Sequence, residues 1–166
     1  MITRLFKRHG KFLWLSTLCL FIASLGYAQK PVRKKAAKNI PAQGICGTVI
    51  LKQGNFMPGP DKPARKGQPI EREVLVFPLL NISQVEQGES GFITSVREAK
   101  PVKTVKSDKN GKFCVSLPIG RYSIIIQEPK GLYANLSDSQ NNIFPVNVTK
   151  NRRSDIRVEI SHQAVF

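Results

Sequence analysis

From Gln43 onward, apolar and polar residues alternate, and Gly, Pro, Asn and Asp interrupt the alternation. No long stretch repeats apolar residues at the spacing of an amphipathic helix. The pattern therefore predicts an all-β domain over residues 43–166. Its seven expected strands lie at 45–52, 72–80, 101–107, 112–117, 121–127, 144–149 and 155–161.

The clearest part of the pattern is DKNGKFCVSLPIGRYSIII, residues 108–126. Asn110 and Gly111 tolerate positive φ and predict a hairpin turn, and Pro118 and Gly120 predict a second turn. The apolar face expected to point inward comprises Phe113, Val115, Leu117, Tyr122, Ile124 and Ile126. The opposite face is expected to expose Arg121, Ser123 and Gln127, with a loop over Ile125. Three antiparallel strands of this kind need a second layer, which strands 72–80 and 155–161 can supply.

Three long polar segments interrupt the strands, at 54–69, 82–100 and 129–142. The first is rich in Gly and Pro, and the second has room for a short helical turn. Loops of this length in a compact domain are either functional or disordered.

The first 28 residues have the pattern of a secretory signal. Four basic residues precede the apolar run 12–25, and Gly26 and Ala28 are the small residues that signal peptidases read. The alternative is a membrane anchor, but the run is shorter than the roughly 20 residues of a span. We expect cleavage near Ala28 and export to the periplasm or the cell surface.

Positive charge is concentrated just after this segment. The chain has a formal net charge of +15, and Lys30–Lys38 holds five basic residues. Segment 29–42 has too few large apolar residues to build a core, so we expect a disordered basic linker. The linker is either a solvated spacer or a peripheral contact with anionic membrane. An exported chain without an aromatic-basic stripe is not expected to bind nucleic acid.

The strand pattern resembles the carboxypeptidase regulatory-like domain. That family has a G-x-V strand and a T-x-x-x-G-x-F-x-x-x-L-P-x-G-x-Y core. The matching residues here are Gly47, Val49, Gly111, Phe113, Leu117, Pro118, Gly120 and Tyr122, with Ser107 where Thr is usual. The chain also looks like exported single-domain members from Bacteroidetes-type bacteria. The resemblance implies a seven-stranded antiparallel Greek-key β-sandwich of the transthyretin (prealbumin) type, and a domain that is not catalytic in the carboxypeptidases. Because the motif specifies turns and core, it indicates fold rather than function.

Catalytic and metal-binding residues are scarce. Of two histidines, only His162 lies outside the expected signal, and its place beside an expected terminal strand favours a surface residue. No spacing of His, Cys and carboxylates matches a zinc site, and no glycine-rich loop matches a P-loop. We therefore predict no catalytic residues, no metal and no cofactor.

Two cysteines, Cys46 and Cys114, remain after the signal, and an even number in an exported chain favours a disulfide. In regulatory-like sandwiches the strands that hold them can lie in one sheet, which makes a cross-strand bridge reasonable. The alternative is two separate thiols packed as small apolar residues.

The expected function is binding, without catalysis, of a glycan or protein partner in the cell envelope. The candidate contact residues lie in two loops: Lys62, Arg65 and Lys66 in the first, and Tyr133, Asn135, Asn141 and Asn142 in the second. Phe56 and Met57 either join this surface or fold back over the end of the sandwich. The alternatives are an envelope assembly role, through membrane lipid or a partner strand, and a hydrolase that uses His162.

Overall fold

A computed structural model of the protein describes residues 41–59 and 65–166. The expected signal, residues 29–40 of the expected linker, and Lys62 lie outside the described residues. The described part holds two 3₁₀ turns, η1 (Ile82–Gln84) and η2 (Glu89–Gly91), and eleven strands. The strands are β1 (Gly44–Asn55), β2 (Gln68–Pro69), β3 (Glu73–Pro78), β4 (Val85–Gln87), β5 (Phe92–Val96), β6 (Lys103–Lys106), β7 (Lys112–Ser116), β8 (Gly120–Glu128), β9 (Gly131–Tyr133), β10 (Pro145–Val148) and β11 (Arg153–Val165).

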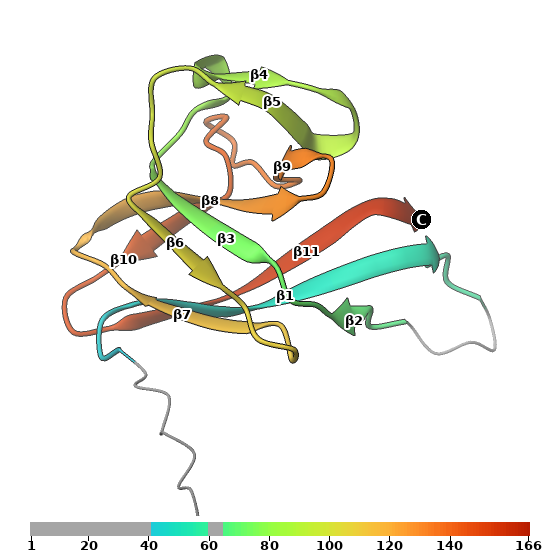
Figure 1. Cartoon of the computed structure of the whole chain (residues 1–166), viewed down its shortest axis with the longest axis horizontal. Coiled ribbons are helices and arrows are strands. Elements are labelled where there is room, and N and C mark those ends of the chain that lie inside the picture. The colour runs from blue at the N-terminus through green and yellow to red at the C-terminus, as the bar shows by residue number, and fades with distance from the viewer. Residues whose placement is uncertain (1–40, 60–64) are drawn as a thin grey trace, which may run out of the picture. The chain divides into compact units, whose positions relative to one another are not determined.

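The strands form two sheets, and almost every pairing is antiparallel (Figure 1). In the first sheet, β1 has β11 on one side, parallel to it, and β7 followed by β2 on the other. In the second sheet, β8 lies between β3 and the successive strands β9 and β10. The order continues from β3 to β6 and from β9 through β5 to β4. The all-β prediction is confirmed.

The core combines alternate residues of both sheets, as the period of two requires. The predicted inward residues of β7 and β8 are buried, and Ile125 is fully buried on the opposite face. Ser123 was predicted to face solvent, and this is wrong. Its side chain is completely buried and accepts a hydrogen bond from the backbone N–H of Leu80 at 2.9 Å. The hydroxyl is needed there because a buried N–H without an acceptor is costly.

All seven predicted strands are present, but the hairpin predicted at Asn110 and Gly111 is wrong, and β6, β7 and β8 do not pair with one another. β6 pairs with β3 in the second sheet, whereas β7 pairs with β1 in the first. The turn at Asn110 and Gly111 therefore links the two sheets instead of closing a hairpin within one. Gly111 has φ +70°, while Gly120 does not need the left-handed region and begins β8. The chain around Gly111 passes so close to β1 that a Cβ would lie 2.4 Å from the carbonyl oxygen of Val49.

The segments predicted as loops contain four further strands. Residues 54–69 include β2, residues 82–100 hold η1, β4, η2 and β5, and residues 129–142 include β9. β2 joins the first sheet, whereas β9, β5 and β4 extend the second sheet beyond β8 (Figure 1). No helix in the described residues is long and apolar enough to cross a bilayer.

Cys46 and Cys114 are directly opposite each other on β1 and β7, and their sulfur atoms lie 2.11 Å apart. The pair thus has the geometry of the predicted disulfide. It joins β7 to the middle strand of the first sheet.

Candidate functional site

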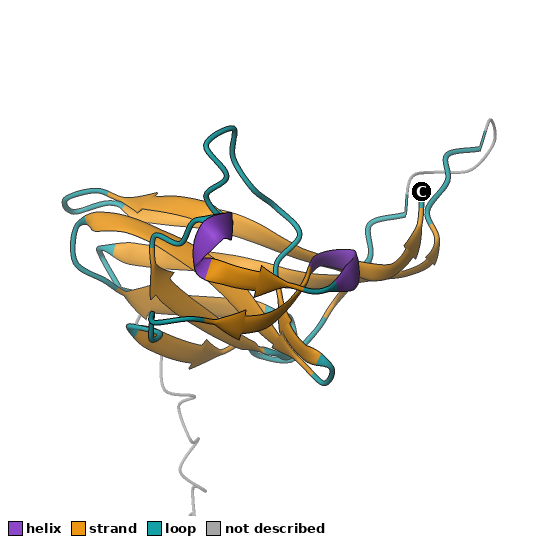
Figure 2. Ribbon diagram, turned by 90° about the horizontal axis from the view of Figure 1, so that it is seen from above, coloured by secondary structure: helices purple, strands orange, loops and turns teal. Residues whose placement is uncertain are grey.

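The ends of β1 and β11 project beyond the other strands as a two-stranded ribbon (Figure 2). β7 and β2 pair with β1 only up to Leu51, whereas β11 accompanies β1 to the pair Asn55–Val165. We call the outer part of this ribbon and the chain that folds along it the ribbon end. Its side chains are Lys52, Phe56, Met57, Arg65, Lys66, Val165 and Phe166.

Aromatic and cationic side chains meet at the ribbon end. The rings of Phe56 and Phe166 have centroids 6.0 Å apart. Lys52 Nζ lies 5.8 Å and 5.5 Å from these two centroids, and the Arg65 guanidinium lies 5.4 Å from that of Phe56. These distances are within the range of cation–π attraction. The Arg65 guanidinium also donates a hydrogen bond to the Asn55 carbonyl at 3.0 Å, which holds the returning chain against β1.

Positive charge exceeds negative charge at this end. Glu159 binds both Lys52, at 2.5 Å, and Arg157, at 2.9 Å. Arg157 in turn donates to the carbonyl oxygen of Lys66 at 2.9 Å. Among the described residues of this end, Lys52, Arg157, Arg65 and Lys66 accompany one carboxylate, a formal excess of three positive charges. A net positive end favours anionic partners.

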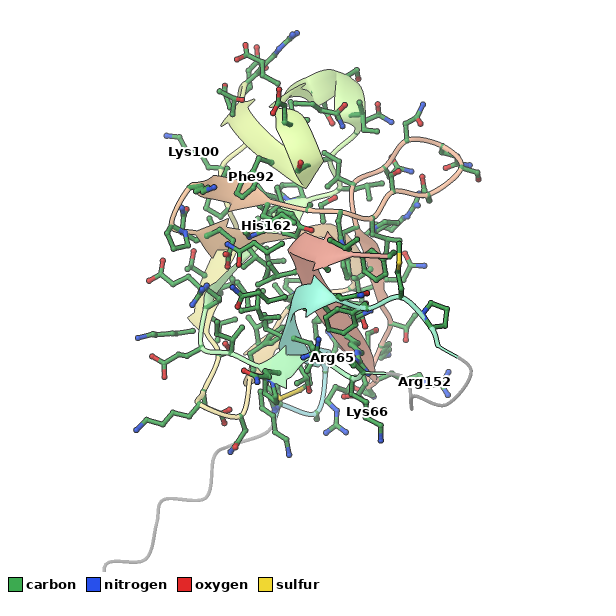
Figure 3. All side chains as sticks on the ribbon, turned by 90° about the vertical axis from the view of Figure 1, so that its right-hand side faces the viewer. Arg65, Lys66, Phe92, Lys100, Arg152 and His162 are labelled. Atoms are coloured by element: carbon green, nitrogen blue, oxygen red, sulfur yellow. A yellow bond between two sulfur atoms is a disulfide. The ribbon has the colours of Figure 1, made fainter. Side chains whose placement is uncertain are left out.

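A hollow of about 530 Å³ opens beside this cluster. It is lined by Leu51, Gln53, Phe56, Arg65, Lys66, Gly67 and Gln68. Two of the predicted contact residues, Arg65 and Lys66, are therefore exposed at one concave surface. Both side chains are labelled in Figure 3. The volume lies within the range of small-ligand sites.

Phe56 and Met57 do not fold back over the core. Phe56 packs against Phe166, and Met57 is 56% exposed. Phe166 is not among the predicted contact residues. The sequence signal for it is an apolar residue directly after a strand whose polar and apolar residues alternate to its end.

The second predicted contact loop is mainly structural. Tyr133, expected at the surface, lies in β9 and is 1% exposed, so its prediction as a contact residue is wrong. Its hydroxyl accepts a hydrogen bond from the backbone N–H of Ser161 at 3.1 Å. Asn142 is also buried and donates its N–H and its side-chain amide to Asp138. Asn141 is exposed, but its backbone carbonyl accepts from Ile82.

Among the predicted contact residues of this loop, Asn135 lines an open space. It lies beside Phe92 at a second hollow of about 250 Å³, between β5 and the chain after β9. Its side-chain amide donates to Ser161 Oγ at 2.9 Å. The structure thus separates Asn135 from Arg65 and Lys66, which line the other hollow.

Asp138 organises the loop, and its behaviour in acid can be tested. The side-chain amide and then the backbone N–H of Asn142 hold the pKa of Asp138 below its ordinary value of 3.8. Because the folded pKa is the lower one, this contribution to stability is present above pH 3.8 and is lost as the pH falls through the folded pKa. We expect Asp138→Asn to weaken the acid dependence of thermal unfolding below about pH 4. Asp155→Asn, at an exposed carboxylate, is the charge-matched control, and an equal effect of both variants would contradict the prediction.

The prediction of His162 as a surface residue is wrong. The His162 side chain is only 6% exposed, and its Nε2 lies 3.2 Å from Glu128 Oε2. The other oxygen of Glu128 accepts from Arg72 Nε at 2.6 Å. The rings of Phe92 and Tyr133 pack on the imidazole, with centroids at 4.9 Å and 5.3 Å. Phe92 and His162 are labelled in Figure 3. This arrangement ties β11 to the second sheet.

The hydroxyl nearest to His162 in the sequence is directed to a different partner from the imidazole. Ser161 directly precedes His162 on the same strand, where side chains alternate between faces. Ser161 Oγ contacts the Tyr133 hydroxyl at 3.3 Å, and His162 contacts Glu128. Among the described residues, no group of three or more His, Cys, Asp or Glu could hold a metal ion.

No protein-family model, no curated protein and no solved structure matches this chain. The function must therefore be argued from the site itself.

Proposed function

We propose that the chain is an exported, non-enzymatic β-sandwich module that binds an anionic glycan or protein partner in the cell envelope. The observation that carries the proposal is the hollow at the ribbon end, where Arg65 and Lys66 are exposed beside Phe56. A positively charged concave surface with one aromatic wall suits a ligand that carries carboxylate or sulfate groups. The rigid sheets behind it fix its shape.

We also propose membership of the carboxypeptidase regulatory-like family, with its transthyretin-type Greek-key sandwich. Several motif positions have the roles that such a motif requires. Phe113, Leu117 and Tyr122 are buried in the core, and Gly111 has positive φ. Gly47 also leaves no room for a Cβ, which would lie 2.5 Å from the carbonyl oxygen of Ile156. These contacts support the family proposal and bear on fold alone.

Binding of soluble acidic polysaccharides tests the proposed function. We expect the chain recovered after export from a bacterial host to bind alginate or polygalacturonate in calorimetry, with an affinity that falls as salt rises. Replacing Arg65 and Lys66 together by serine should weaken binding by about tenfold or more, since two charge-assisted contacts are lost. The matched control replaces Lys100 and Lys103, two exposed lysines outside the hollow, by serine.

Two results would count against this proposal. The first is that neither the polysaccharides nor acidic proteins of an envelope extract bind. The second is that both double variants lose affinity equally, because binding would then depend on overall charge and not on the hollow.

An assembly role through membrane lipid is the second candidate, and a separate observation favours it. The ribbon end exposes Met57, Val165 and Phe166, which a glycan contact does not require.

A further inference from the structure

The apolar side chains of the ribbon end are unusually exposed. Met57 and Val165 are each 56% exposed and Phe166 is 64% exposed. Three of the six most exposed large apolar residues of the described part thus gather at one place, and the others are Val102, Ile119 and Leu136. Folded proteins rarely leave such a group in water without a partner.

These residues are held together by the fold. Val165 pairs with Asn55 at the last register position of the ribbon, and the N–H of Phe56 donates to the Val165 carbonyl at 2.8 Å. The Met57 N–H donates to the side chain of Asn55 at 2.8 Å, which fixes the chain as it leaves β1. Val165 is the last residue of β11, and Phe166 follows it directly. The exposed apolar side chains are therefore at the tip of a projecting ribbon, a shape suited to insertion.

Cations surround the apolar residues at a short distance. Lys52 lies 5.5 Å from the Phe166 ring, and Arg65 lies 5.4 Å from the Phe56 ring. Lys and Arg beside exposed aromatic and aliphatic side chains are the combination found at membrane interfaces, where the cations meet anionic head groups. A soluble acidic glycan would use the cations and leave Met57 and Val165 in water.

We propose that the ribbon end docks on an anionic lipid bilayer, with Met57, Val165 and Phe166 inserted at the interface and the exposed Arg65 and Lys66 on the head groups. This goes beyond the proposed glycan or protein contact and rests on the second candidate function, because it names anionic lipid as the partner and the ribbon end as the contact.

Vesicle co-sedimentation tests the proposal with the exported chain. We expect binding to phosphatidylcholine vesicles that contain phosphatidylglycerol and weaker binding to pure phosphatidylcholine. Met57→Ser with Phe166→Ser should lower the partition coefficient by about tenfold or more, since two apolar side chains no longer leave water. Arg65→Ser with Lys66→Ser should lower it roughly thirtyfold on the anionic vesicles. Ile119→Ser with Leu136→Ser is the matched control and should leave it unchanged, because both residues are exposed but lie away from the ribbon end.

A local probe separates insertion from charge attraction. The only tryptophan of the chain is Trp14, in the expected signal, so Phe166→Trp in a Trp14→Phe background places one reporter at the ribbon end. Its emission should shift to the blue on anionic vesicles and should be quenched by brominated lipid. Alginate should produce neither effect, because it contains no apolar phase.

The outcomes distinguish the two proposals. Unchanged vesicle binding by the Met57/Phe166 variant, or an unshifted tryptophan, overturns the lipid inference. Binding of alginate through Arg65 and Lys66 without vesicle binding overturns the inference and supports the proposed function. If the chain binds neither vesicles nor acidic polysaccharides, both proposals fail.

Discussion

Replacing Cys46 and Cys114 together by alanine is expected to lower the free energy of unfolding by about 2–5 kcal/mol. The two residues are 68 positions apart in sequence, and closing a loop of that length removes about 4 kcal/mol of chain entropy from the unfolded state. The bridge also holds β7, which pairs with β1 alone among the described strands. Because β7 carries Phe113 and Val115 into the core, a loose β7 would expose core surface as well.

Guanidinium unfolding followed by circular dichroism measures this effect. The wild-type chain should lose stability when a reductant is added, and the double alanine variant should not respond. Without reductant, the unfolded wild-type chain should offer no reactive thiol at positions 46 or 114 to a maleimide. Labelling of both thiols in that state, or an identical midpoint of the variant and wild type, would contradict the prediction.

The sequence predicted the seven principal strands because burial of one sheet face imposes a period of two. The same rule explains why the short strands were not predicted. β4, β5 and β9 have three to five residues each, too few for an alternating pattern to stand out from a polar loop. They form because β9 continues the edge of β8 through the pairs Ile126–Tyr133 and Gln127–Leu132, which are tertiary contacts.

The local pattern also could not predict which of the two sheets each strand joins. Turn chemistry at Gly111 was correctly identified, and its N–H donates to the Asp108 carbonyl at 2.7 Å. A turn, however, does not determine whether the strands on either side of it pair. Here the next strand, β7, finds its partner in β1, more than sixty residues earlier, and the cysteine pair was the one sequence signal that joined these two strands.

The candidate binding surface was predicted in part. Arg65 and Lys66 were chosen because basic residues in a long loop are exposed, and exposure is what the structure shows. Tyr133 was misassigned because a single aromatic in a polar segment can serve either the core or the surface. Phe166 was overlooked because its exposure depends on how far β1 and β11 extend past their neighbours, which no local pattern gives.

The sequence also contains a signal for the contact between Glu128 and His162. Glu128 continues the inward series of Ile124 and Ile126, and His162 continues that of Val158 and Ile160. An ionisable residue at a core-facing position requires a buried partner. Two ionisable residues at core-facing positions of long strands are therefore expected to be partners. Their separation in the sequence alone does not predict this contact.

Replacing Glu128 by alanine should therefore be among the most destabilising single changes, with a cost of about 3–5 kcal/mol. The carboxylate is 4% exposed and binds both Arg72 and His162, so its removal leaves the buried His162 and the partly exposed Arg72 without this partner. We expect the lower end of this range because Arg72 is 25% exposed and keeps its hydrogen bond to the carbonyl of Glu71. Glu128→Gln, which retains an acceptor for Arg72, should cost about half as much.

Chemical unfolding of these variants, with Glu86→Ala as the control, decides whether the buried carboxylate holds β11 in place. Glu86 is an exposed carboxylate on β4, and its removal should change the free energy of unfolding by less than about 0.5 kcal/mol. The double variant Glu128→Ala with His162→Ala should be more stable than the sum of the single effects predicts, because each single change already breaks the same contact. Additive effects would show that the two side chains do not stabilise one another. A Glu128→Ala variant as stable as the Glu86 control would show that the ion pair with Arg72 contributes nothing, since desolvation of the charges then cancels their attraction.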